Sequence, residues 1–420
     1  MTAPIPAPKK KPLSYRRSTC RLCDGHDLDV VLPLAPTPLV DAYIKQDRLH
    51  LKQEPIPLDL ALCRTCGHVQ LLDVVDPDVI YTDYLYETVS SLGLPEHFDA
   101  YAEDVLERIK PAKDALVFDV GSNDGNLLKA FKKRGMRVLG IDPAREIAHK
   151  ATANGLETVA DFFSLALAKE LKAKHGPAAI VTTNNLYANI DEMHDLTEGV
   201  RHMLAADGVF VFESSYLADM IDNMVFDFIY HEHLSYFSAR PVAAFFKRHG
   251  LELIDVQHTA PKGGSMRYTA QLQGGPRKAT PAVAVQLAYE EKRGLQSPAT
   301  FKAWSAVIEK AKADTVAALS GFKDKKVCGY GASATTTTLI HHLGIGGQLE
   351  CFFDDYAIKQ NTFSPGLHIP VVPSSEIYVR KPDLIFVAAW RYAGPIMKKH
   401  EAFAKAGGKW LIPLPETKVV

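Results

Sequence analysis

Ala115-Leu-Val-Phe-Asp119-Val-Gly121-Ser-Asn-Asp-Gly125-Asn-Leu-Leu128 reads as a buried strand that enters a glycine turn and continues into a helix. The two glycines allow the backbone to approach a ligand closely at the helix N-terminus. Their G-x-x-x-G spacing does not match the G-x-G-x-x-G fingerprint of dinucleotide-binding domains. The stretch therefore predicts a nucleotide-binding α/β domain of another kind.

Acidic residues follow the next two predicted strands. The strand at 137–141 ends on Asp142, 21 positions beyond Gly121, where a carboxylate can accept hydrogen bonds from both ribose hydroxyls. A third element ends on Asp161 and Phe162, which suit an adenine amino group and its ring face. This is the pattern of a class I S-adenosylmethionine-dependent methyltransferase, and an NAD(P)-dependent enzyme is the alternative. The predicted ligands of S-adenosylmethionine are Asp119, Gly121, Asn123, Gly125, Asp142, Asp161 and Phe162.

Two Cys-x-x-Cys pairs near the N-terminus predict a metal site. Cys20, Cys23, Cys63 and Cys66 can supply four thiolates in a tetrahedron, which is the closed arrangement of a structural Zn²⁺. Redox or disulfide use of these cysteines is the alternative. Because four protein ligands leave no open position, a zinc ion here is expected to be structural and not catalytic.

The order of the patterns predicts the domains. Strands at 179–183 and 207–213 and a hairpin at 251–258 and 266–272 complete the first sheet, and a second strand–glycine–helix pattern begins at Lys326. The fold class is α/β, with a class I methyltransferase (Rossmann-like) core, an N-terminal zinc-binding module and a second, C-terminal Rossmann-like domain. The expected parts are a flexible tail (1–14), the zinc-binding module (15–76), the methyltransferase domain with a catalytic insertion (77–280), a helical connector (281–322) and the C-terminal domain (323–420).

Composition excludes several classes of protein. The formal net charge of −1 supplies no basic field for nucleic acid or membrane surfaces, and no apolar run is long enough to span a bilayer. The N-terminus lacks the apolar segment of a signal peptide, and six cysteines in 420 residues do not indicate a secreted disulfide scaffold. A cytoplasmic location is expected.

A polar cluster lies between the fifth predicted strand and the final hairpin. Residues 229–238 read Ile-Tyr-His-Glu-His-Leu-Ser-Tyr-Phe-Ser. His231 and His233 are candidate metal ligands, His233 is a candidate general base, and a polar loop is the third interpretation. The i, i+2 spacing of the histidines disfavours a shared metal. An insertion at this point of a doubly wound fold covers the carboxyl ends of the strands, where ligands bind, and this favours a functional role.

Several separated motifs, in order, resemble the sugar C-methyltransferase family over nearly the whole chain. They are the paired Cys-x-x-Cys knuckles, Val120–Gly125, Tyr230–Phe237, Gly263–Arg267, Tyr330–Ala332, Asp354–Gln360 and Pro365–Val371. The resemblance implies methylation at C3 of a nucleotide-linked 4-keto-6-deoxysugar, with S-adenosylmethionine as cosubstrate and the sugar nucleotide between the central and C-terminal domains. A dTDP- or GDP-linked sugar is the expected partner, and the protein is expected to be a monomer.

Such a reaction needs a base for the C3 proton and donors for the enolate oxygen. The resemblance implies His233 as the base with Tyr230 and Glu232 beside it, Tyr84 or Tyr86 as the active-site tyrosine, and Asn185 as a further catalytic residue. Asn189 stands where the family usually has histidine, which leaves open a different substrate stereochemistry, another acceptor atom or a non-catalytic sugar-nucleotide-binding protein. The predicted substrate-binding residues are Asn189, Arg267, Tyr330, Ser333 and Lys359; an ion pair within the protein is the alternative role of Arg267.

Overall fold

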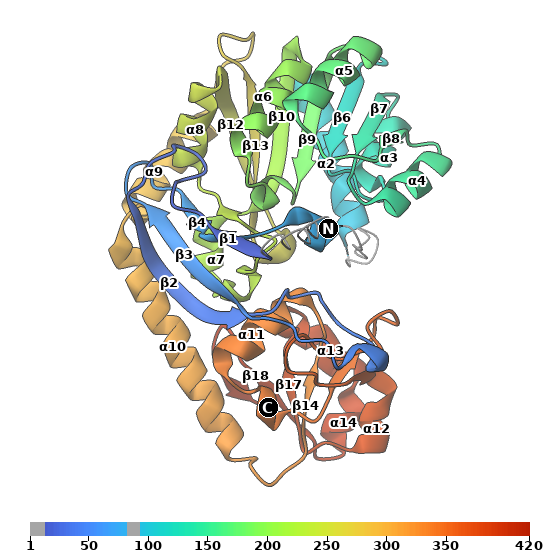
Figure 1. Ribbon diagram of the computed structural model, residues 1–420, viewed down its shortest axis with the longest axis vertical. Helices are drawn as coiled ribbons and strands as arrows, with labels where there is room; N and C mark the ends of the chain where they lie inside the picture. The colour runs from blue at the N-terminus through green and yellow to red at the C-terminus, as the bar shows by residue number, and fades with distance from the viewer. Residues whose placement is uncertain (1–12, 82–92) are drawn as a thin grey trace, which may run out of the picture.

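The structure is a computed structural model that describes residues 13–81 and 93–420 (Figure 1). Tyr84 and Tyr86, the two candidates for the active-site tyrosine, lie outside the described residues. Two α/β lobes are stacked along the long axis of the molecule, and an antiparallel sheet from the N-terminal region connects them along one side. No helix in the described ranges is long and apolar enough to cross a membrane.

A mixed seven-stranded sheet forms the central lobe. Its strands are β6 (Leu116–Val120), β7 (Arg137–Ile141), β8 (Thr158–Val159), β9 (Ala178–Asn184), β10 (Leu204–Ser215), β12 (Leu251–Thr259) and β13 (Ser265–Leu272). They lie in the order β12-β13-β10-β9-β6-β7-β8, and β13 runs antiparallel to both of its neighbours. Every residue of β6 is buried, because helices cover both faces of the sheet, and Asp119 is the one charged residue among its apolar side chains. The predicted α/β fold with its terminal hairpin is confirmed.

Helices and short turns surround this sheet. The helices are α2 (Leu94–Ile109), α3 (Asn126–Lys133), α4 (Arg145–Ala153), α5 (Leu165–His175), α6 (Met193–Met203), α7 (Leu217–Asp222) and α8 (Ala239–Arg248). Three 3-10 turns, η3 (Tyr187–Asn189), η4 (Phe226–Phe228) and η5 (Pro261–Gly263), lie beside the carboxyl ends of β9 and β10 or between β12 and β13. These turns carry much of the site described below.

A four-stranded sheet organises the N-terminal region. The elements of this region are β1 (Ser14–Arg16), β2 (Leu28–Thr37), β3 (Ile56–Cys63), β4 (Val69–Leu71), β5 (Asp73–Val75) and α1 (Pro77–Tyr81), and β1 and β5 form a separate two-stranded sheet. The sheet order is β11-β4-β3-β2, where β11 (Ser235–Tyr236) comes from the polar segment of the central region. The N-terminal sheet therefore fixes the position of a segment that lies more than 150 residues further along the chain.

A parallel sheet with one antiparallel edge forms the C-terminal lobe. The connecting helices are α9 (Pro281–Arg293) and α10 (Pro298–Ser320), and α10 runs along the outside of the molecule beside β2 and the C-terminal lobe (Figure 1). The lobe contains β14 (Val327–Tyr330), α11 (Ala334–Leu343), β15 (Phe352–Asp354), β16 (Val371–Pro373), α12 (Ile377–Arg380), β17 (Leu384–Val387), α13 (Ala393–Lys399), α14 (Glu401–Lys405), β18 (Lys409–Ile412) and β19 (Lys418–Val419). The strand order is β16-β15-β14-β17-β18-β19.

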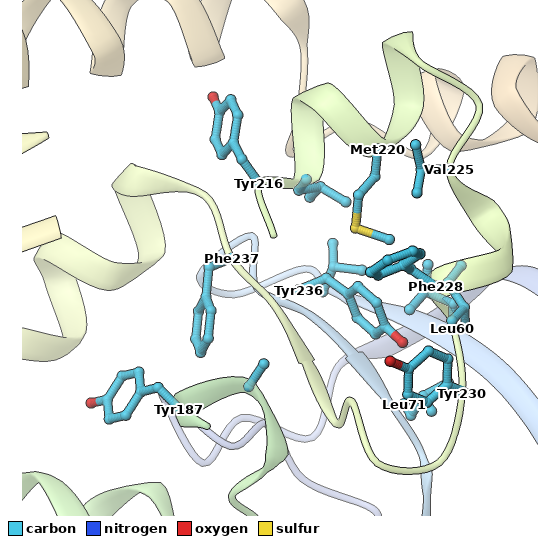
Figure 2. Packing of buried hydrophobic residues seen from close by; sticks show 14 of the residues in the cluster. Leu60, Leu71, Tyr187, Tyr216, Met220, Val225, Phe228, Tyr230, Tyr236 and Phe237 are labelled. Carbon is cyan, nitrogen blue, oxygen red and sulfur yellow. The ribbon is translucent and has the colours of Figure 1, made fainter. Parts of the chain in front are cut away.

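The connection between β2 and β3 reaches the C-terminal lobe. Ile44 forms a β-bridge with Phe363, and the Thr337 hydroxyl donates to the Val40 carbonyl at 2.8 Å. Figure 2 shows that Leu60 and Leu71 of the N-terminal sheet pack in one buried cluster with Tyr230 and Tyr236. The segment at 229–238 thus packs against apolar side chains from the N-terminal sheet.

Candidate active site

One large cavity joins the two lobes. Its volume is about 1660 Å³, larger than the roughly 300–1,000 Å³ typical of a pocket for one small ligand. The walls come from the carboxyl ends of β6, β7 and β9, from residues 41–48, from residues 228–234, and from the glycine turn and following loops of the C-terminal lobe. The cavity is large enough to hold two substrates at once.

The central-sheet wall carries the predicted S-adenosylmethionine ligands. Asp142 accepts hydrogen bonds from the backbone N–H groups of Asn123 (2.9 Å) and Ala144 (2.9 Å), which fixes its carboxylate at the end of β7. Asp119 is 3 % exposed and accepts a hydrogen bond from the Thr182 hydroxyl at 2.6 Å. Burial raises the pKa of Asp119 to about 7.

The glycine turn fits a ligand that approaches the backbone. Gly121 has a φ of +74°, and a Cβ at this position would come within 2.8 Å of Leu186. Asp161 and Phe162 are exposed on the cavity wall. Gly125 does not line the cavity; a Cβ there would lie 2.6 Å from Leu156, so this glycine allows α3 to pack closely. The remaining predicted ligands face one space and suit the ribose and adenine of S-adenosylmethionine.

His233 lies between this wall and the C-terminal lobe. Its Nδ1–H donates to the Phe228 carbonyl at 3.0 Å, which leaves Nε2 with its lone pair. The Tyr230 ring packs against the imidazole with centroids 4.1 Å apart. Burial lowers the pKa of His233 to about 3, and the nearby charge of Lys262 acts in the same direction. The imidazole is therefore neutral at physiological pH.

Glu232 also lines the cavity. Burial raises the pKa of its carboxyl to about 7, assisted by Asp41 and opposed by Lys359 and Lys262. Within the described part of the chain, no group donates a hydrogen bond to this carboxylate. It is thus available to a ligand hydroxyl.

His231 has a structural environment. It is 1 % exposed, and its Nε2–H donates to the Pro57 carbonyl at 3.2 Å. Over residues 13–81 and 93–420, the only group of side chains with metal-ligand geometry is the cysteine cluster. The structure does not support the alternative of a metal shared by His231 and His233.

The N-terminal module and the C-terminal lobe both contact the segment that carries His233. Asp227 is fully buried and accepts hydrogen bonds from Trp390 Nε1 at 2.9 Å and from Arg391 Nη1 at 2.9 Å. The Thr338 hydroxyl donates to the Ile229 carbonyl at 3.0 Å. From the N-terminal side, Arg21 Nη1 donates to the Leu234 carbonyl at 3.2 Å. His233 is therefore positioned by contacts from three regions of sequence.

Asn185 and Asn189 follow β9 and face the cavity. Asn185 has a left-handed φ of 54°, and its backbone N–H donates to the Glu213 carbonyl at 2.9 Å. Asn189 ends η3, where its backbone N–H donates to the Leu186 carbonyl at 2.7 Å. The structure brings both asparagines to the same wall as His233.

The predicted substrate residues divide into two groups. Ser333 caps the N-terminus of α11 and lines the cavity, as does Lys359, whose ammonium group lies 2.6 Å from Asp41 and 4.2 Å from the centre of the Tyr43 ring. Tyr330 and Arg267 do not line it. The Tyr330 hydroxyl bonds Asp355 (2.9 Å) and His400 (3.1 Å) within the C-terminal lobe.

Arg267 is 5 % exposed and belongs to a buried network of charges. It lies 3.0 Å from Glu213 and 3.1 Å from Asp104, and its guanidinium stacks 3.8 Å from the centre of the Tyr101 ring. Glu213 and Arg267 face each other across the pair of strands β10 and β13. This corresponds to the ion-pair alternative and corrects the expectation that Arg267 contacts the substrate.

The four N-terminal cysteines fit a structural zinc ion. Their Sγ atoms all lie within 4.8 Å of one another, with 3.6 Å between Cys20 and Cys66 and 3.5 Å between Cys23 and Cys63. In a tetrahedral site with Zn–S bonds of about 2.3 Å, neighbouring sulfurs are about 3.8 Å apart. These residues would hold the ion, and its role would be to cross-link the N-terminal module.

The structure adds residues that sequence analysis missed. Asp41 and Tyr43 enter the wall from the loop between β2 and β3, and Lys262 enters it from η5. Asp227 and Arg391 join the lobes beside it. Nothing in the local pattern of the sequence marks these positions, although Lys262 stands directly before a Gly-Gly pair that indicates a tight turn.

Comparisons with known proteins agree with this architecture. Three family models match in succession: a zinc binding domain at 20–81, a methyltransferase domain at 95–256 and a C-methyltransferase C-terminal domain at 260–415. The C-methyltransferase NovU of Streptomyces niveus is 33% identical over 406 residues, which cover 96% of each chain.

Two solved methyltransferases each match less than half of this chain. Magnesium protoporphyrin IX methyltransferase of Synechocystis with bound S-adenosylhomocysteine has a TM-score of 0.35 at 13% identity, covering 46% of this chain and 90% of its own. An S-adenosylmethionine-dependent methyltransferase of Clostridium acetobutylicum has a TM-score of 0.35 at 12% identity, covering 43% and 92%. The assignment depends on strand order and on the family matches, and not on these scores.

A class I strand order, a glycine turn with acidic residues at the strand ends and a C-methyltransferase domain define an S-adenosylmethionine-dependent C-methyltransferase. The match to NovU spans nearly all of both chains. The chain therefore belongs to the sugar C-methyltransferase family that its motifs resemble, and the NAD(P)-dependent and non-catalytic alternatives are set aside.

Proposed function

We propose that this enzyme methylates C3 of a nucleotide-linked 4-keto-6-deoxysugar, with a dTDP- or GDP-linked sugar as substrate. The observation that carries the proposal is the position of His233 in a cavity shared by the methyltransferase wall and the C-terminal lobe, with no hydrogen bond to Nε2 from residues 13–81 or 93–420. Membership of the family supports the same substrate class.

The acceptor carbon becomes nucleophilic only after it loses a proton. His233 Nε2 takes the proton from C3, and the electron pair of that bond forms the C3–C4 double bond of an enolate with negative charge on O4. S-adenosylmethionine supplies an electrophilic methyl group, so a C3–CH₃ bond forms as the S–CH₃ bond breaks and the C4 carbonyl is restored. Proximity and alignment in the shared cavity supply the rest of the acceleration.

The residues around His233 have distinct tasks in this proposal. Tyr230 supports the imidazole ring, and Phe228 directs Nε2 toward the substrate through its carbonyl. Glu232 binds a sugar hydroxyl, and Asn185 donates to the oxygen that gains charge. Asn189 contacts the sugar on the same wall.

The C-terminal wall suits the diphosphate of the substrate. Ser333 is the N-cap of α11, so the positive end of the helix dipole faces the cavity near Lys359. The proposal takes the enzyme to act as a monomer. Light scattering during turnover would test the monomer.

The decisive experiment uses labelled S-adenosylmethionine and a panel of dTDP- and GDP-4-ketosugars. The expected product carries a new C–C bond at C3, identified by NMR. Transfer of the label to oxygen or nitrogen, or to no member of the panel, would refute the proposed carbon acceptor.

A further inference from the structure

We propose that Lys262 is a catalytic residue that places its ammonium charge against O4 of the ketosugar and stabilises the enolate. This inference rests on the proposed function, because it needs an enolate intermediate. Lys262 lines the cavity from a turn that is held in place on both sides, and acidic and basic groups surround it.

Lys262 lies at the edge of the sheet where ligands bind. The strand β13 runs antiparallel to β10, so its first residue, Ser265, pairs with Ser215 at the carboxyl end of β10. The turn η5 that carries Lys262 comes directly before β13 and contributes Lys262 to the cavity wall. The same wall contains Glu232 and His233, which approach from the segment after β10.

The backbone of Lys262 is in a conformation that lysine rarely adopts. Its φ of 58° and ψ of 25° are in the left-handed region, and the following Gly263 and Gly264 also have positive φ, of 85° and 119°. Strain of this kind costs about 1–3 kcal/mol and is typical of functional sites. Lys110 and Lys381, which lie outside the cavity, share this backbone conformation, so the inference depends on where the Lys262 side chain lies.

Contacts on both sides hold the turn in place. The Asn223 side-chain amide donates to the Gly263 carbonyl at 2.9 Å, and the Tyr216 N–H donates to the Gly264 carbonyl at 3.3 Å. The Ser265 hydroxyl donates to the Pro261 carbonyl at 3.1 Å. The ammonium group thus extends from a rigid base, as pre-organised electrostatic stabilisation requires.

Lys262 is a cation without a close partner in the described part of the chain. Its ammonium group makes no hydrogen bond or ion pair there, whereas Lys359 is paired with Asp41. Burial lowers the pKa of Lys262 to about 8, and the more distant charges of Glu213 and Glu232 oppose this shift. The group is protonated at neutral pH and is free to meet an oxygen anion.

The charge acts on the first chemical step. When the C3–H bond breaks, the proton passes to His233 and the carbonyl π pair moves to O4, next to the Lys262 ammonium group. When the methyl group is transferred, the pair on O4 re-forms the C4 carbonyl, the C3=C4 pair forms the C3–CH₃ bond and the S–CH₃ pair stays on sulfur. O4 thereby loses its negative charge, and Lys262 neither gains nor loses a proton. A donor of this kind typically contributes about 10²–10³ in rate.

The test uses the full-length enzyme and compares Lys262→Met, which removes the charge, with Lys262→Arg, which keeps it. Lys278→Met, an exposed position beyond the other end of β13, is the matched control. The measurements are deuterium exchange at C3 in D₂O with S-adenosylhomocysteine present, steady-state methylation, and affinity for S-adenosylhomocysteine as a check on folding.

Lys262→Met is expected to lower both the exchange rate and kcat by about 10²–10³, with S-adenosylhomocysteine affinity unchanged and with partial recovery in Lys262→Arg. A loss confined to KM would assign Lys262 to the diphosphate and overturn the proposal, as would exchange within threefold of wild type. If the wild-type enzyme exchanges no ketosugar in the panel, the proposed function fails first and this inference fails with it.

Discussion

Replacement of His233 by asparagine isolates the lone pair of Nε2. The Nδ2 amide of asparagine overlays the imidazole Nδ1, so the hydrogen bond to the Phe228 carbonyl, 3.0 Å long in the wild type, can be kept. The substitution removes only the acceptor atom that faces the cavity and part of the contact with Tyr230. The variant is therefore expected to fold and to bind S-adenosylhomocysteine normally.

The expected loss follows from the role of a general base. Such a base contributes about 10²–10⁴ in rate, which corresponds to about 3–5 kcal/mol of barrier. Because proton removal comes before methyl transfer, C3 exchange and methylation should fall together. In contrast, a residue that only aligned the methyl donor would slow methylation and leave exchange intact.

Exchange at C3, followed by NMR in D₂O with S-adenosylhomocysteine bound, is the direct assay. Isothermal titration with S-adenosylhomocysteine provides the control for folding. If His233→Asn exchanges the C3 proton within threefold of the wild-type rate, another group removes the proton and the assignment of His233 is wrong.

Four further outcomes are expected. Asp142→Asn should weaken S-adenosylhomocysteine binding about tenfold, measured by calorimetry, because a charged acceptor for the ribose is lost; unchanged affinity would contradict the cofactor assignment. The pKa of Glu232 is raised to about 7, so the wild type loses stability as pH rises from about 4.5 to 7. Glu232→Gln should therefore gain stability relative to wild type over that window, by at most about 3 kcal/mol in urea unfolding. An equal difference in unfolding free energy between variant and wild type at pH 5 and at pH 8 would argue against it. Asp227→Ala should destabilise the protein by about 3–5 kcal/mol, because Arg391 is left as an unpaired, largely buried charge; a loss below 1 kcal/mol would disprove this. Cys63→Ser should release the zinc ion and lower both Tm and methylation, since the N-terminal sheet pairs with β11 beside His233; full activity in the metal-free protein would show that this sheet does not position the base.

Local patterns were sufficient for most of the fold. The predicted bounds of the strand at 137–141 and of the two hairpin strands agree with the structure to within one residue. Such strands can be predicted because the apolar run and the turn that define each of them are adjacent in the sequence. The cysteine cluster is confirmed for a similar reason, since each Cys-x-x-Cys pair is a short local motif, and Asp142 stays a predicted ribose ligand. The predicted S-adenosylmethionine and structural zinc are supported by the family matches and by the cysteine cluster.

Local sequence patterns could not predict which side chains from distant segments contact each other. Arg267 faces Glu213 across two strands, and this register determines that its charge is used inside the protein. The Tyr330 hydroxyl is likewise bonded within the C-terminal lobe and does not reach the cavity. Each error placed a suitable side chain near a ligand without knowledge of its partners.

The polar segment at 229–238 shows where the two sources of information divide. Residue types and their order indicate that a histidine and a glutamate suited to acid–base chemistry lie near the ends of the central strands. Tertiary structure alone showed that β11 pairs with β4, that Asp227 binds Arg391, and that Lys262 enters the same cavity. The physical reason is that composition and spacing report local conformational preference, whereas burial, pKa and the direction of a lone pair depend on atoms brought together from across the chain.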